Sequence, residues 1–307
     1  MVDRLIRFEV DCTGVRLDRF LADHVANLTR THLQRLIKEG RATVDGVEAK
    51  SSRRLETGQQ VSLELPEAAP VRLAAEDIFV PVIFEDEDVV VVDKPAGMVV
   101  HPGNGVSSGT LVNAMLARYP EMQVFGDSLR PGIVHRLDKG TSGVMVVAKT
   151  PAAQRHLQRQ FADHTVQKTY IALVHGSPQP ERGLIEGGIG RSRQNPTRMA
   201  ISGRAERSAR TAYVVLERLR GYSLVEAQPI TGRTHQIRLH FSALGHSLVG
   251  DTTYGTGGET LGLDRQFLHA RKLRVVLPLN GVEREFQSEL PPDLQDALAQ
   301  LRTRTGH

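Results

Sequence analysis

The chain has little of several features that often stabilise a fold or anchor it. Its 307 residues include one cysteine, Cys12, and no tryptophan. A single cysteine excludes an intrachain disulfide and a zinc site built from cysteines, and it fits a protein of the reducing cytoplasm. We therefore expect a cytoplasmic protein.

Long apolar segments are also missing. No run approaches the roughly 18 apolar residues that a membrane-spanning helix needs, and the first residues, MVDRLIRFEV, lack the apolar core of a signal peptide. The sequence has no low-complexity tract and no repeat at the period of a solenoid. We expect a soluble monomer that does not contact a membrane.

The composition is ordinary for a globular protein, with 40% hydrophobic and 24% charged residues. The formal net charge is only +4, but the charges are unevenly distributed. Thr29–Arg54 holds seven Lys or Arg against three acids, Ile189–Arg220 holds eight against two, and Glu67–Asp93 holds eight acids against one Arg. The two basic zones predict surfaces that bind the phosphates of a polyanion.

Residues 14–66 have the pattern of a small separate domain. Apolar positions with helical spacing predict one helix over residues 17–25 and a second over residues 30–40. Asp45-Gly46, between two short alternating segments, is typical of a tight hairpin turn. We expect a linker at residues 67–76, which contain proline and several alanines.

A second domain is expected at residues 77–303. The all-valine run Val89–Val92 predicts a strand buried on both faces, Thr150 before Pro151 predicts a helix start, and Pro292–Leu301 predicts the last helix. Helices and strands alternate without a regular βαβ period. The expected fold class is α+β, with a mixed, largely antiparallel central sheet and flanking helices.

The segment from Arg130 to Thr150 contains one carboxylate, Asp138, among cations and tight turns. Arg136 and Lys139 flank this carboxylate and favour its ionised form, which keeps it available as a nucleophile or base. On residue types alone, a structural Asp–Arg pair at a turn is the more common outcome.

Five segments in order resemble the motifs of the RluA/RluC/RluD-type pseudouridine synthases. HRLDKGTSG, from His135, resembles their signature loop; the others are DKPAGMVVHPG from Asp93, QKTYIALVHG from Gln167, TGRTHQIRLH from Thr231 and RQFLHARKL from Arg265. The resemblance implies isomerisation of uridine in RNA, in which a C5–C1′ bond replaces the N1–C1′ bond. It implies no cofactor and no metal.

The resemblance also assigns roles to individual residues. Asp138 is implied as the catalytic aspartate, Arg238 as its partner, and Tyr170 as the residue that stacks on the base and helps to remove the C5 proton. Arg136 is implied to enter the RNA stack in place of the flipped uridine. Attack of Asp138 on C1′ and removal of a C2′ proton both fit. The motifs add four substrate contacts: His135, Lys168, Arg233 and Ile237.

The segment LIKEGRATVDG, from Leu36, resembles the S4 RNA-binding domain, with Asp45 where asparagine is usual. Aspartate supports the same turn geometry. An S4 domain implies phosphate contacts, whereas a solvated helix face is the ordinary alternative. The candidate contacts are Arg30, Arg35, Lys38, Arg41, Arg53 and Arg54.

The expected substrate is large-subunit (23S) ribosomal RNA, as in the RluD-like branch. The alternatives are a transfer RNA pseudouridine synthase, a catalytically silent RNA-binding ribosome-assembly factor, and a nucleoside hydrolase or glycosidase. A hydrolytic glycosidase normally needs two carboxyl groups, and the sequence offers no evident second one.

Three features leave other interpretations open. Gly140 stands where the family usually has a polar or acidic residue. GDTTYG, from Gly250, fits both a family loop and a plain turn. His135 and His235 have no third ligand at a convincing spacing, so we expect no metal site.

Overall fold

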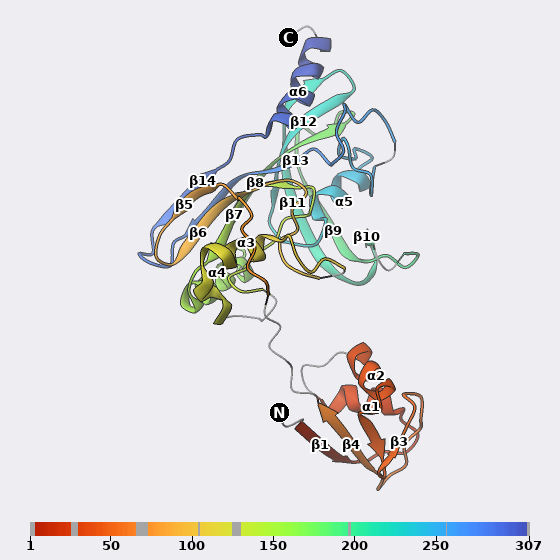
Figure 1. Cartoon of the computed structure of the whole chain (residues 1–307). Helices are drawn as coiled ribbons and strands as arrows, with labels where there is room; N and C mark the ends of the chain where they lie inside the picture. Colours follow the sequence, from red (N-terminus) through yellow and green to blue (C-terminus); the bar gives the residue numbers. More distant parts are fainter. Residues whose placement is uncertain are drawn as a thin grey trace. The chain divides into compact units, whose positions relative to one another are not determined.

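The computed structural model describes residues 4–25, 30–65, 73–103, 105–124, 130–195, 198–255 and 257–305. The chain divides into two compact units, Met1–Val71 and Arg72–His307 (Figure 1). Within the described ranges, no helix is long and apolar enough to cross a bilayer.

The N-terminal unit is a four-stranded sheet with two helices. Its elements are β1 (Arg4–Glu9), α1 (Leu17–His24), α2 (Arg30–Lys38), β2 (Ala42–Val44), β3 (Val47–Glu48) and β4 (Gln60–Leu65), with strand order β1-β4-β2-β3. Phe20 of α1 and Leu33 of α2 are almost completely buried in one core, as the helical spacing predicts. Asp45 and Gly46 both have positive φ, 53° and 78°, which is typical of a hairpin turn.

Strand β1 precedes the range 14–66 that we expect for this domain. It pairs with β4 along its whole length, from Arg4 opposite Leu65 to Glu9 opposite Gln60. Its apolar residues Ile6 and Phe8 are half-buried and alternate with exposed neighbours, the pattern of a strand with one face on the core.

The C-terminal unit is built on one ten-stranded sheet. Its strands are β5 (Val82–Glu85), β6 (Val89–Lys94), β7 (Ser142–Ala148), β8 (Gln167–His175), β9 (Arg182–Arg191), β10 (Met199–Ile201), β11 (Arg204–Leu219), β12 (Tyr222–Pro229), β13 (Leu268–Val276) and β14 (Glu283–Gln287). Their order is β10-β9-β11-β12-β8-β13-β7-β6-β5, with β14 beside β13. The β13–β7 pair is parallel and the others are antiparallel. The prediction of a mixed, largely antiparallel sheet is confirmed.

Helices cover both faces of this sheet (Figure 1). They are α3 (Leu111–Arg118), the 3₁₀ turn η1 (Pro120–Val124), α4 (Pro151–Ala162), α5 (Gln236–Ala243) and α6 (Pro292–Thr305). Val90 and Val92 pack with α3, whereas Val89 and Val91 pack with α4. The prediction that Val89–Val92 is buried on both faces is confirmed, since all four residues are 0% exposed.

The start of this unit overlaps the expected linker. Residues 66–72 lie outside the described ranges, but Leu73 is 7% exposed and belongs to the core beside α3. The side chain of Asn113 in α3 donates a hydrogen bond to the carbonyl of Ala74 at 2.7 Å. The chain is therefore already part of the folded unit at Leu73.

A buried histidine in α5 predicts a pH-dependent stability. His240 is 0% exposed, and burial lowers its pKa from 6.5 to about 4. The unfolded chain therefore binds a proton that the folded chain excludes, so stability falls as the pH falls below about 6.5; this histidine accounts for about 2 kcal/mol between about pH 8 and about pH 5. We expect His240→Gln to reduce the pH dependence of the free energy of unfolding by that amount, measured by urea denaturation. An unchanged dependence would show that folding does not lower the pKa of His240.

Candidate active site

A pocket of about 520 Å³ opens where the signature loop, β8 and the start of α5 meet. These segments are far apart in the sequence, and the sheet order brings them together. The pocket includes every site residue that the motifs of the second domain predict: His135, Arg136, Asp138, Lys168, Tyr170, Arg233, Ile237 and Arg238.

Asp138 lies within the signature loop, ahead of β7. The Thr141 amide donates to the Asp138 carbonyl at 3.0 Å and closes the turn. Gly143 then has φ +117°, and a Cβ there would overlap the carbonyl oxygen of Ala270 in β13. Glycine is needed at this position because β7 and β13 approach each other closely in their parallel pairing. The loop is thus fixed to the middle of the sheet.

A buried lysine forms hydrogen bonds that stabilise the signature loop. Lys94, at the end of β6, is 0% exposed, and its Nζ donates to the carbonyls of Met98 at 2.8 Å and Lys139 at 3.5 Å. Burial lowers the pKa of Lys94 to about 7, although the charge of Asp138 opposes this shift. The lysine therefore ties two turns together and places an amine near the carboxylate.

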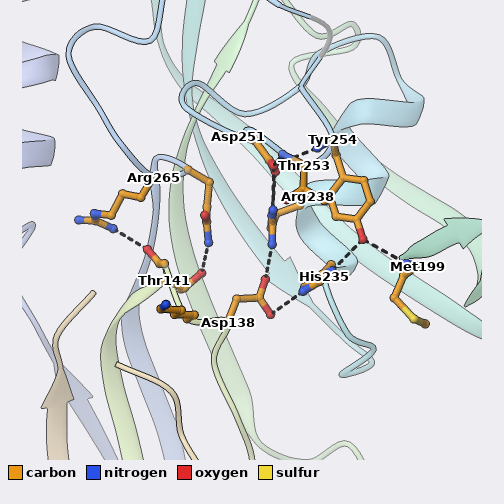
Figure 2. Close-up of polar contacts among 12 residues, drawn as sticks. Asp138, Thr141, Met199, His235, Arg238, Asp251, Thr253, Tyr254 and Arg265 are labelled. Carbon is orange, nitrogen blue, oxygen red and sulfur yellow. Dashed lines mark hydrogen bonds and ion pairs between the residues drawn. The ribbon is translucent and has the colours of Figure 1, made fainter. Parts of the chain in front are cut away.

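Arg265 and Gln266, which precede β13, also form hydrogen bonds with the signature loop (Figure 2). Arg265 donates to the carbonyl of Gly140 at 3.0 Å, and the Gln266 amide donates to Thr141 Oγ1 at 3.0 Å. A Cβ at Gly140 would lie 2.7 Å from Gln266 Oε1. The glycine that departs from the family pattern leaves space for this glutamine.

Arg238 contacts two carboxylates (Figure 2). Its Nε and Nη2 donate to the two oxygens of Asp251 at 2.7 and 2.8 Å, and its Nη1 donates to Asp138 Oδ2 at 3.3 Å. Burial alone would lower the pKa of Arg238, but the hydrogen bonds and charge of Asp251 outweigh it and raise that pKa. The bidentate pair with Asp251 fixes the guanidinium plane, and the remaining nitrogen faces Asp138.

Asp251 is not a second catalytic carboxylate. Its side chain is 1% exposed, and besides binding Arg238 it accepts the amides of Thr253 and Tyr254 at 3.0 Å each. Among the described residues that line the pocket, Asp138 is the one carboxylate. The two-carboxylate arrangement of a hydrolytic glycosidase is therefore not present in the described pocket.

Tyr170 and Lys168 enter the pocket from β8. Burial raises the pKa of Tyr170 and the charge of Asp138 raises it further, so the phenol keeps its proton at neutral pH. Burial lowers the pKa of Lys168 to about 8, and its Nζ lies 3.5 Å from the carbonyl of Thr231. A neutral aromatic ring beside a carboxylate is suited to stacking on a base.

The contacts of His135 are those of a residue that stabilises the fold. Its ring stacks on Phe161 of α4 at a centroid distance of 4.6 Å, and its Nε2 accepts the Val146 amide at 3.1 Å. Burial lowers the pKa of His135 to about 3, with a smaller contribution from Lys168. The neutral imidazole therefore satisfies a backbone donor of β7 instead of exchanging protons.

Cations surround Asp138 among the described residues that line the pocket. Arg136 is exposed, and Arg233 donates from Nε to the carbonyl of Ser208 at 3.1 Å. Arg130 and Lys168 also contribute to the lining. Cations placed around one carboxylate fit a substrate with several phosphates.

The six basic residues predicted for the S4 domain lie in the N-terminal unit. Arg35 forms an exposed ion pair with Glu39 at 3.2 Å, and Arg54 donates to the carbonyl of Gly14 at 2.8 Å. The others are Lys38, which is exposed, Arg41 and Arg53, which are half-buried, and Arg30, whose side chain lies outside the described residues.

The sequence alone does not single out Asp251 or Tyr254. Both belong to the segment GDTTYG, which also fits a plain turn. Tyr254 stacks under Arg238, with its ring centroid 5.0 Å from the guanidinium carbon, and its hydroxyl lies 2.8 Å from His235 Nδ1. A buried arginine needs a carboxylate partner, but the burial of Arg238 is known only from the structure.

Comparisons with known proteins identify the family of the chain. A family model described as RNA pseudouridylate synthase matches residues 88–243, and a model of the S4 domain matches residues 15–61. A Chloroflexus aurantiacus protein named as an uncharacterized RNA pseudouridine synthase is 47% identical over 295 residues, which cover 96% of this chain and 92% of the relative. A Zymomonas mobilis protein named ribosomal large subunit pseudouridine synthase D is 40% identical over 296 residues, 92% of each chain.

A solved structure of the same family is also similar to this chain. The human RNA pseudouridylate synthase domain containing 1 superposes with a TM-score of 0.59 at 31% identity, covering 75% of this chain and 96% of that chain. The sequence match to the family model spans the signature loop, β8 and all of α5. The chain therefore belongs to the RNA pseudouridylate synthase family and carries an S4 domain ahead of its catalytic domain.

Proposed function

We propose that this enzyme converts specific uridines of large-subunit (23S) ribosomal RNA to pseudouridine, with Asp138 as the group that acts on the ribose. The observation that carries this proposal is the position of Asp138 as the one carboxylate among the described lining residues of a pocket rich in cations. The ribosomal substrate is supported by the name of the Zymomonas mobilis relative.

The reaction needs one carboxylate and consumes nothing. In the nucleophilic route, an oxygen of Asp138 bonds to C1′ and the N1–C1′ electrons remain on the uracil. The base rotates, C5 displaces the carboxylate from C1′, C5 loses its proton and N1 gains one. In the elimination route, Asp138 takes a proton from C2′ as the N1–C1′ bond breaks and its electrons remain on the uracil. C5 then bonds to C1′ as the proton returns to C2′, and C5 loses its proton while N1 gains one.

The neighbouring residues suit either route. Arg238 contacts Asp138 Oδ2 and keeps a positive charge beside the carboxylate. Tyr170, whose raised pKa keeps it neutral, acts as a surface for the rotating base. Arg136, exposed in the pocket lining, takes the place of the flipped uridine in the RNA stack.

We propose that the S4 domain binds phosphates of the RNA. Loss of its basic residues should then change how RNA affinity depends on salt concentration. Replacing two phosphate contacts with Arg35→Gln and Lys38→Gln lowers the slope of log affinity against log salt by about 1.4 to 1.8, or about 0.7 to 0.9 per contact. Filter binding of ribosomal RNA at several salt concentrations measures this slope. A matched control is Arg302→Gln with Arg304→Gln, because these arginines pair with Glu217 and Glu259. Equal slopes in both double variants would contradict a role for α2.

The substrate is tested by mapping pseudouridine in ribosomal and transfer RNA with carbodiimide-dependent primer extension. Cells lacking the protein are compared with cells restored by the intact chain and by Asp138→Asn. We expect particular large-subunit stops to vanish with the gene and to return only with the intact protein. Stops that change only in transfer RNA would establish the transfer RNA alternative, and no change in any RNA would contradict the enzyme.

We also propose that the protein acts as a monomer in the cytoplasm. Cys12 is a free, half-buried thiol, which fits a reducing compartment. Sedimentation of the purified chain at micromolar concentration tests the monomer, and a concentration-dependent increase in mass would contradict it.

A further inference from the structure

His235 has an unusual backbone conformation at the edge of the pocket. It is the residue before α5 and has φ +57° and ψ 22°, the left-handed region. Residues other than glycine are uncommon there, with Asn, Asp and His the most frequent exceptions. The conformation places the imidazole in the pocket lining beside Asp138 (Figure 2).

The hydrogen bonds around His235 favour one position for its ring proton (Figure 2). The Met199 amide donates to the hydroxyl oxygen of Tyr254 at 3.3 Å, since an amide can only donate. The single proton of the phenol is then available for His235 Nδ1, at 2.8 Å. When the phenol donates to Nδ1, the ring proton of the neutral imidazole lies on Nε2, and this is the tautomer that we assign.

That proton faces the catalytic carboxylate. Nε2 of His235 lies 3.8 Å from Asp138 Oδ1, while Arg238 Nη1 lies 3.3 Å from Oδ2. The two oxygens of Asp138 thus face two different donors. The first distance exceeds a hydrogen bond, but catalytic hydrogen bonds are often long in the free enzyme and shorten when the substrate is bound.

We propose that His235 is a positioning residue, which donates from Nε2 to Asp138 Oδ1 and holds the carboxylate in the plane required at the ribose. The proposal rests on the proposed role of Asp138. Met199, Tyr254 and His235 form a relay that begins at a backbone amide of β10 and ends at the carboxylate. His235 donates as a neutral ring, because burial lowers its pKa and the charges of Arg238 and Arg136 oppose the effect of Asp138 and Asp251.

Two substitutions separate the donor from the backbone conformation. His235→Asn keeps a residue that tolerates the left-handed region but cannot reach Asp138. His235→Gln can place its amide nitrogen where Nε2 lies. We expect kcat to fall about 10- to 100-fold in the asparagine variant, the usual cost of losing a hydrogen bond to a charged group, with KM unchanged, and to recover at least partly in the glutamine variant.

Other outcomes of the kinetics would overturn the proposal. A wild-type kcat in His235→Asn would show that no positioning is needed. An increase in KM with kcat unchanged would make His235 an RNA contact. Equal losses in both variants, with melting temperatures like the wild type, would exclude the Nε2 donor as the cause.

A second measurement does not depend on activity. Nitrogen-15 NMR of the free protein reports which nitrogen of His235 carries the proton, and the relay predicts Nε2 in the wild type. Tyr254→Phe removes the proton that fixes this tautomer, so we expect the Nδ1–H form to increase. A wild-type ring protonated on Nδ1 would refute the relay even if the enzyme is active. If the enzyme makes no pseudouridine, the proposed function fails, whereas this result still decides the relay.

Discussion

Asp138→Asn is expected to abolish pseudouridine formation, with turnover reduced at least about 1000-fold and RNA affinity within about twofold of the wild type. Asparagine has nearly the same shape and can still accept a hydrogen bond from Arg238. It cannot attack C1′ or take a proton, so both chemical routes stop. Arg238 keeps its bidentate partner Asp251, so the surrounding structure is retained. Tritium release from RNA labelled at C5 of uridine measures turnover, and filter binding measures affinity.

The control for this variant is Asp163→Asn. Asp163 is an exposed carboxylate at the C-terminal end of α4, so its replacement should leave turnover unchanged. Appreciable turnover by Asp138→Asn would reject the assignment of Asp138. Loss of RNA binding together with turnover would make Asp138 a binding or structural residue.

Asp251→Asn is expected to reduce both stability and activity. Removing one member of a buried ion pair costs about 3 to 5 kcal/mol, because the other charge is left buried with too little compensation. Arg238 would also lose at least one of the two hydrogen bonds that orient it toward Asp138, because the amide nitrogen of asparagine cannot accept. We expect turnover to fall at least about 100-fold in the folded fraction, the scale of a catalytic group misplaced by about 1 Å. Urea denaturation and steady-state kinetics measure the two effects.

A surface ion pair provides the comparison. Glu285 on β14 contacts Arg274 at 2.9 Å, and both side chains are partly exposed. Glu285→Gln should cost about 0 to 1 kcal/mol and leave turnover unchanged. If Asp251→Asn had the stability and turnover of the wild type, Arg238 would not need a buried partner and the proposed orientation would be wrong.

Local sequence patterns predicted much of the fold because their physical causes are local. Thr150 accepts the Ala153 amide at 3.1 Å and begins α4 at Pro151, as the capping pattern predicts. The Val89–Val92 run needed only its own composition to predict a strand buried on both faces. Strand β1 was missed because six residues of modest alternation indicate a strand only when their partner, β4, is known.

The motifs predicted which residues line the pocket, but the sequence did not predict the contacts between these residues and their neighbours. Asp138 and Arg238 are 100 residues apart, and they meet because β7 pairs in parallel with β13 while β13 pairs with β8. No local pattern specifies that order of strands. The roles of Asp251 and Tyr254 depend on the same topology, so the turn interpretation of GDTTYG was equally consistent with the sequence. Lys94 lies in the motif segment that begins at Asp93, but its role as a support of the loop follows only from its burial.

The measurement that tests the central claim most directly is a nucleoside balance with the purified protein. Large-subunit ribosomal RNA lacking the modification is incubated with the intact chain and with Asp138→Asn, digested, and analysed by liquid chromatography and mass spectrometry. We expect the intact chain to convert uridine to an equal amount of pseudouridine without free uracil, and the variant to form neither. Release of free uracil, or pseudouridine formed by Asp138→Asn, would contradict it.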